Sequence, residues 1–136
     1  MGLLSNFDIS GSAISAQSLR LNTTASNMAN ADTVSSTEQG AYRSRQTVFQ
    51  SVLKDQTRPA EASVQMIGIV ESSKSIQLKF DPGHPLANED GYVFTSNVDA
   101  VEEMVNMLSA SRAYQNNVEV LNTSKELLLR TLSLGN

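Results

Sequence analysis

The chain has 136 residues, 40% of them hydrophobic and only 5% aromatic. Its formal charge is −4, and the charged residues are distributed along the sequence rather than grouped in runs. The lack of a basic face excludes nucleic acid as an expected partner, and the lack of cysteine excludes disulfides and thiolate chemistry. Residues 1–15 lack the charged start and apolar core of a cleaved signal peptide, and no window approaches the roughly 20 apolar residues of a membrane span. With so few large apolar residues, the chain is expected to gain stability by associating with neighbours.

The first expected element is a helix over about residues 7–31, capped by Asp8 or Ser10. Its large apolar residues recur every seven positions, and a small residue lies three positions before each, which indicates one narrow heptad seam. The large residues are Ile14, Leu21 and Met28, and the small ones are Gly11, Ser18 and Ala25. The remaining surface is Ser, Gln, Asn and Thr, which are only fair helix formers, so the helix needs a partner along this seam.

The middle of the chain, residues 36–97, has a different pattern. Short β-like runs occur at 42–49, 52–53, 64–70, 76–80 and 92–95, and turn signals such as Asp90-Gly91 separate them. These features predict a small β-rich module inserted between two helices.

The last expected element is a long helix over about residues 98–134, which has no Gly or Pro and is capped by Ser96 or Asn97. Gly135 is expected to end it. A second heptad seam runs through Met107, Ser111, Tyr114, Val118, Leu121, Lys125, Leu128 and Leu132. The predicted fold is therefore α+β, with helical segments 1–35 and 98–136 pairing as a coiled coil and the module of residues 36–97 inserted between them in the chain.

The sequence contains few candidates for a catalytic or metal-binding site. His84 is the only histidine, and it lies in a loop between Gly and Pro without a predicted nucleophile beside it, which favours a structural role in a turn. The nearby acidic residues Asp81, Glu89 and Asp90 lack the alternating spacing of a calcium-binding loop. No catalytic residue, metal site or cofactor is predicted.

Two polar clusters stand out. The first, residues 26–33, contains Asn27-Met28-Ala29-Asn30 and is typical of a helix end followed by a turn. The second, residues 109–117, is either a solvated stretch of helix or a set of polar side chains that fixes the register against a neighbouring helix. The adjacent Glu102 and Glu103 point to different sides of a helix, so they are not an acid/base pair.

These clusters carry a family resemblance. Residues 7–33, with Asn27-Met28-Ala29-Asn30 at their core, resemble the N-terminal signature of the flagellar rod and hook proteins. Residues 98–125 resemble the C-terminal helix of the proximal rod members of that family, and residues 42–49 and 81–93 resemble their intervening segments. Ile14 and Met28 stand where the family usually has Leu, which is a volume-conserving change.

The resemblance implies a non-enzymatic structural subunit of the bacterial flagellar basal body, needed for motility. Such subunits are exported unfolded through the flagellar type III apparatus without a cleaved signal peptide. They assemble in the periplasm with copies of themselves, with other rod proteins and with proteins at the membrane-ring junction, forming a hollow helical shaft that transmits torque. Neither nucleic acid nor direct membrane insertion is expected.

The helix seams and the N-terminal signature together give the expected assembly-interface residues. They are Ile14, Leu21, Asn27, Met28, Asn30, Met107, Tyr114, Val118, Leu121, Leu128 and Leu132. One alternative is a cytoplasmic adaptor or chaperone that lays one long helix in a partner's groove, which predicts a well-folded monomer with ordered ends. The other is an enzyme, which would need a convergent polar site.

Overall fold

The structure is a computed structural model that describes residues 3–53 and 62–135. Two helices, α1 (Leu3–Ala29) and α2 (Ala100–Leu134), flank five strands. The strands are β1 (Val34–Ser35), β2 (Arg45–Leu53), β3 (Ala62–Glu71), β4 (Gln77–Phe80) and β5 (Tyr92–Thr95). The α+β composition expected from the sequence is confirmed, and the coiled-coil pairing of the helices stays a prediction.

The chain forms two compact units, and both helices run through both of them. The first unit contains Met1–Leu21, Thr47–Gly68 and Leu108–Asn136, and the second contains Asn22–Gln46 and Ile69–Met107. Each unit therefore combines parts of α1 and α2 with part of the β structure. The division into residues 1–35, 36–97 and 98–136 stays an interpretation of the sequence.

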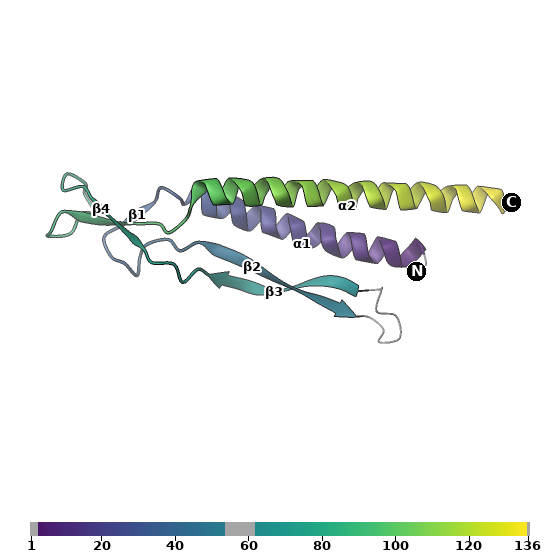
Figure 1. Cartoon of the computed structure of the whole chain (residues 1–136), viewed down its shortest axis with the longest axis horizontal. Helices are drawn as coiled ribbons and strands as arrows, with labels where there is room; N and C mark the ends of the chain where they lie inside the picture. Colours follow the sequence, from purple (N-terminus) through teal and green to yellow (C-terminus); the bar gives the residue numbers. More distant parts are fainter. Residues whose placement is uncertain (1–2, 54–61, 136) are drawn as a thin grey trace. The chain divides into compact units, whose positions relative to one another are not determined.

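The second unit holds a three-stranded antiparallel sheet in the order β1-β5-β4 (Figure 1). Val93 of β5 is only 1% exposed and is the largest apolar side chain that is fully buried among the described residues. The turn before β5 uses Gly91 at a φ of 81°, a left-handed conformation that favours glycine, as the Asp90-Gly91 pair predicted.

The first unit packs α1 against the two-stranded sheet of β2 and β3, which run side by side in opposite directions (Figure 1). The Ser12 hydroxyl of α1 accepts a hydrogen bond from the backbone N–H of Val64 at 3.1 Å and donates one to the Ile9 carbonyl at 2.8 Å. Ala16, one turn further along α1, is buried. Small and hydroxyl-bearing side chains thus let the strand approach the helix closely.

Both helices begin at positions other than those expected. Because α1 starts at Leu3, Asp8 and Ser10 lie inside it and neither is its N-cap. In α2 the cap is Asp99, whose Oδ1 accepts hydrogen bonds from the N–H groups of Val101 at 2.9 Å and Glu102 at 3.2 Å. Asn97 was predicted as a cap, but its amide is engaged elsewhere in the second unit.

We expect Gly11→Ala to raise the free energy of unfolding of the isolated chain by about 0.5–1 kcal/mol, because alanine favours the helix and glycine gains entropy when unfolded. A Cβ at Gly11 would meet no atom within 4 Å, so the fold has room for it. Urea unfolding followed by circular dichroism measures the change. The matched control is Gly91→Ala, which should destabilise the chain because its Cβ would lie 3.0 Å from the Phe80 ring. Equal effects of the two substitutions would contradict this reasoning.

Candidate functional site

The most highly connected side chain in the second unit is Asn27, near the end of α1. It is 1% exposed. Its Nδ2 donates to the carbonyl of Arg45 at 2.8 Å and to Oε1 of Glu103 at 2.9 Å. Its Oδ1 accepts from the N–H of Arg45 at 2.9 Å and from the Tyr42 hydroxyl at 3.0 Å. One amide thus binds both backbone groups of Arg45 and a carboxylate 76 positions along the chain.

A second buried amide, Asn97, holds the same segment from the other end. Its Oδ1 accepts from the N–H of Ser44 at 2.7 Å, and its Nδ2 donates to the Lys74 carbonyl at 2.8 Å. The Ser44 carbonyl accepts from the N–H of Ser72 at 2.7 Å. Buried backbone groups must find partners, and here two Asn side chains and one loop supply them where β2 begins.

Glu103 completes this arrangement from α2. Its side chain is buried, and Oε1 accepts hydrogen bonds from Asn27 and, at 3.4 Å, from the Ser44 hydroxyl. Glu102 points to another side of the helix, as expected, and binds Lys74 at 2.9 Å, and this hydrogen bond and negative charge raise the pKa of Lys74. A buried carboxylate is costly without donors, so the amide of Asn27 is needed to keep Glu103 inside.

We call Asn27, Ser44, Asn97 and Glu103 the Asn27 cluster. It joins the end of α1, the segment before β2 and the start of α2, which are far apart in sequence. Its role is to position chain segments: the Asn27 amide and the Ser44 hydroxyl donate to the Glu103 carboxylate, and the Asn97 amide binds the N–H of Ser44 and the carbonyl of Lys74. Among the described residues, no three His, Asp or Glu side chains gather as metal ligands would. The cluster is suited to holding chain segments in a defined register.

The two asparagines of the N-terminal signature have different environments. Asn27 is internal, whereas Asn30 donates to the Ser26 carbonyl one turn back in α1 at 2.8 Å, in an exposed position. Asn30 therefore terminates the helix locally, as the sequence suggested for this cluster. Met28 lies between them and is half-buried.

The predicted seam positions of α2 lie partly covered. Met107, Val118, Leu121 and Leu128 are half-buried, Tyr114 is at the border of exposure and Leu132 is 61% exposed. The fully buried positions are the small or polar residues Glu103, Ala110 and Ser124. Lys125, expected in the seam, is exposed, and its neighbour Ser124 lies inside. The predicted positions in α1, Ile14 and Leu21, are half-buried.

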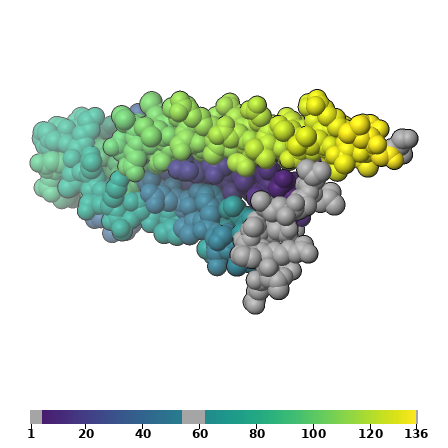
Figure 2. Space-filling model, turned by 45° about the vertical axis from the view of Figure 1, so that its right-hand side comes forward, coloured from purple at the N-terminus to yellow at the C-terminus, as the bar shows by residue number. Residues whose placement is uncertain are grey.

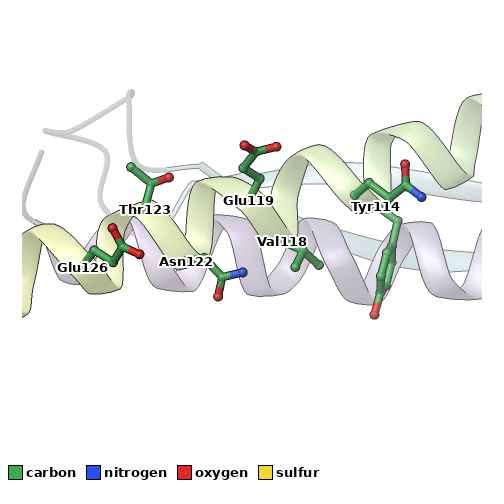
Figure 3. A pocket seen from close by; sticks show the side chains of 7 residues that line it. Tyr114, Val118, Glu119, Asn122, Thr123 and Glu126 are labelled. Atoms are coloured by element: carbon green, nitrogen blue, oxygen red, sulfur yellow. The ribbon is translucent and has the colours of Figure 1, made fainter.

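A shallow groove of about 490 Å³ runs along α2 in the first unit and includes two of these seam residues. Figure 3 shows Tyr114, Val118 and Asn122 on one side of the helix and Glu119 on the opposite side. The groove is lined by Tyr114, Gln115, Val118, Glu119, Asn122, Thr123 and Glu126. Its lining comes from one helix and has mixed polarity, which is typical of a surface for packing rather than of a cavity that encloses a small molecule. A role of the seam residues in assembly stays a prediction.

His84 lies in the loop between β4 and β5. Its side-chain Nδ1 accepts a hydrogen bond from the backbone N–H of Leu86 at 3.1 Å, and the backbone N–H of His84 donates to the Asp81 carbonyl at 3.1 Å. The imidazole therefore stabilises a turn, which is the structural role expected from the sequence.

We expect His84→Asn to leave swimming speed at the level of the natural protein, because an Asn side-chain oxygen can accept the same turn hydrogen bond. Motility on soft agar measures this, with Asn27→Leu as the control that should fail. A swimming defect in cells with normally assembled rods would contradict a purely structural role.

Sequence reasoning missed three members of the Asn27 cluster, namely Ser44, Asn97 and Glu103. Hydropathy periodicity identifies buried positions only where they carry large apolar residues, so it does not identify buried polar residues. One signal was available: Glu103 precedes Met107 by four positions, so the two residues share one face of α2. A carboxylate on that face needs donors, but no local pattern identifies Asn27, 76 positions away, as one of them.

Comparison with known proteins agrees with this architecture. A family model for the flagella basal body rod protein matches residues 7–34, and one for the flagellar basal body rod FlgEFG protein C-terminal matches residues 89–134. The flagellar basal-body rod protein FlgC of Yersinia enterocolitica is 53% identical, and that of Salmonella typhimurium is 50% identical. Each comparison covers 99% of both chains. The chain belongs to the FlgC family of flagellar basal-body rod proteins and is a structural subunit of the flagellar rod.

Proposed function

We propose that the chain builds the proximal rod by packing its terminal helices against copies of itself and other rod proteins. The helices pair as a coiled coil, and each subunit adds one segment to a hollow shaft that transmits torque. The role is mechanical and not enzymatic. Close-packed helix seams suit it, because dense interfaces resist shear in many directions.

The observation that carries this proposal is the apolar surface of α2. Ten large apolar side chains on this helix are exposed by a third or more: Val101, Met104, Val105, Leu108, Tyr114, Val120, Leu127, Leu129, Leu132 and Leu134. A typical monomer shows no apolar patch larger than roughly 300–600 Å², and larger ones mark interaction sites. A helix with apolar residues on this many sides is expected to be buried in an assembly.

The C-terminal part of α2 gives the sharpest example. Successive helix residues point about 100° apart, so Leu127, Leu128 and Leu129 face three directions. Leu128 is half-buried, whereas Leu127 and Leu129 are 49% and 56% exposed. Figure 2 shows this end of the helix, in yellow, open on the face in view. Covering both exposed leucines requires more than one neighbouring subunit.

Export and location follow from the same proposal. We propose that the chain passes unfolded through the flagellar type III apparatus and assembles in the periplasm, beginning at the membrane-ring junction. No helix in the described parts of the chain, residues 3–53 and 62–135, has the length and apolarity needed to cross a membrane.

Electron microscopy of purified basal bodies tests the proposal. The expected result is density for both helices of this chain within the proximal rod, with α2 enclosed by helices of neighbouring subunits. A tagged chain that supports swimming but stays in the cytoplasm as a monomer would favour an adaptor or chaperone instead. Rod density in which α2 faces solvent along its length would contradict assembly through the helices.

A further inference from the structure

One face of the β4–β5 pair in the second unit is an apolar surface. The antiparallel register places Leu78 opposite Phe94 and Phe80 opposite Tyr92, so these four side chains share one face. Leu78 and Phe80 are 59% and 63% exposed and Tyr92 is 39% exposed. The rings of Phe80 and Tyr92 meet edge to face at 5.1 Å. A pre-formed aromatic pair that is open to solvent is typical of a contact surface.

A groove of about 750 Å³ follows β4 and extends this surface. Its apolar lining is Ala31, Val34, Leu78, Phe80 and Val98. Acidic side chains lie on the groove wall and on the adjoining loop: Asp32, Asp81, Glu89 and Asp90. Within residues 3–53 and 62–135, none of these four forms an ion pair, and Lys79 is the only nearby cation on β4. The β4–β5 face is therefore an apolar surface bordered by side chains with a net negative charge.

The C-terminal end of α2 has the complementary character. Lys125 and Arg130 have no ion-pair partner in the described part of the chain, and they outnumber the single acidic residue of this end, Glu126. Leu129, Leu132 and Leu134 are 56%, 61% and 87% exposed. The end of α2 is basic with exposed leucines, and the β4–β5 face has exposed aromatic rings bordered by acidic side chains. The two surfaces are therefore complementary in charge, and both are apolar.

This contact must join two different copies of the chain. Residues 100–134 form one helix of 35 residues, which is about 50 Å long. Tyr92 precedes Ala100 by eight residues, and eight extended residues span at most about 28 Å. The end of α2 therefore cannot reach the β4–β5 face of its own chain.

We propose that the C-terminal end of α2 in one copy docks onto the β4–β5 face of a second copy, with Leu132 near Phe80 and the two cations near the acidic loop. The proposal rests on the assembly function above and names one of its contacts. The two surfaces differ, so the contact is head-to-tail, and repeating it produces a chain of subunits rather than a closed dimer. Such a contact lets copies of one subunit follow one another along a helical shaft.

Disulfide trapping tests the contact directly, because the natural chain has no cysteine. Phe80→Cys and Leu132→Cys are placed on two differently tagged chains that are expressed together, and purified basal bodies are oxidised mildly. We expect a linked species at twice the 14.7 kDa of one chain that carries both tags. The matched control pairs Leu132→Cys with Val48→Cys, which is similarly apolar and 39% exposed but lies on β2. This control pair should remain monomeric.

A second measurement needs no substitution. Carbodiimide treatment of basal bodies containing the natural chain joins lysines to carboxylates that touch them, and mass spectrometry should find Lys125 linked to Asp81, Glu89 or Asp90. The head-to-tail contact is excluded by any of three outcomes. Neither link forms, the control pair is linked to the same extent, or the linked partner is a protein other than this chain. In each of these cases the chain is still found in the rod, so the assembly function stands. Absence of the chain from basal bodies would instead remove the assembly function itself.

Discussion

Asn27→Leu is expected to lower the free energy of unfolding of the isolated chain by about 3–5 kcal/mol, a large share of the roughly 5–15 kcal/mol typical of a domain. Leucine has a similar size but removes every hydrogen bond made by the amide. The N–H and carbonyl of Arg45 lose their partner, and the buried carboxylate of Glu103 loses its amide donor. Urea unfolding monitored by circular dichroism measures the loss as a lower midpoint.

Asn30→Leu is the matched control within the same four-residue signature. Asn30 makes one exposed hydrogen bond to the carbonyl of Ser26, so its loss should cost no more than about 1 kcal/mol. If the two substitutions cost the same, the Asn27 cluster does not hold the second unit together. Cells carrying Asn27→Leu should also lack filaments, whereas cells carrying Asn30→Leu should keep them.

Asn27→Asp gives this prediction a pH signature. The new carboxylate would face Oε1 of Glu103, which lies 2.9 Å from Nδ2 of Asn27 in the natural chain. Two buried carboxylates at that distance repel each other when both are charged and are stabilised when one takes up a proton, so the variant gains stability as the pH falls and loses it as the pH rises. The variant should therefore be closer in stability to the natural chain at pH 5 than at pH 8. An equal deficit at both pH values would show that the two carboxylates do not meet.

The pattern of α2 shows what the sequence could and could not predict. The seven-residue spacing of Met107, Tyr114, Leu121 and Leu128 was visible, because large apolar residues define a heptad seam. Two of the alternate positions are less buried than the residues just before them: Ser111 is half-buried and Lys125 is exposed, whereas Ala110 and Ser124 are buried. Small residues allow close approach at buried positions, and a hydropathy pattern cannot distinguish them from solvated ones.

The polar cluster at the end of α1 shows the reverse case. Its residue types predicted a helix end, and α1 does end at Ala29. The role of Asn27 in binding Glu103 could not be predicted, because the partner is 76 positions away and no local periodicity connects them. The long-range pairing of Asn97 with Ser44 was hidden for the same reason, since local capping rules gave Asn97 a plausible but wrong role. Local rules predict elements, and long-range polar contacts need the fold.

Leu121→Asp is expected to abolish hook and filament formation while the chain is still made and exported. Leu121 is half-buried on the seam of α2, and an unpaired carboxylate there would cost several kcal/mol once neighbouring helices exclude water. Rod packing repeats each contact at every copy, so one defective surface weakens the assembly at many places. The β1-β5-β4 sheet belongs to the second unit, so circular dichroism should still report strand structure.

The matched control is Asn122→Asp, which introduces the same charge one residue further along α2 at an exposed polar position. Cells carrying it should swim, because the carboxylate remains solvated. Electron microscopy of cells and immunoblots of exported protein separate assembly from synthesis. Full-length flagella on Leu121→Asp cells would exclude helix-seam packing as the assembly mechanism. Loss of flagella with both variants would instead show that α2 tolerates no added charge on this turn, and that the half-buried seam is not what distinguishes Leu121.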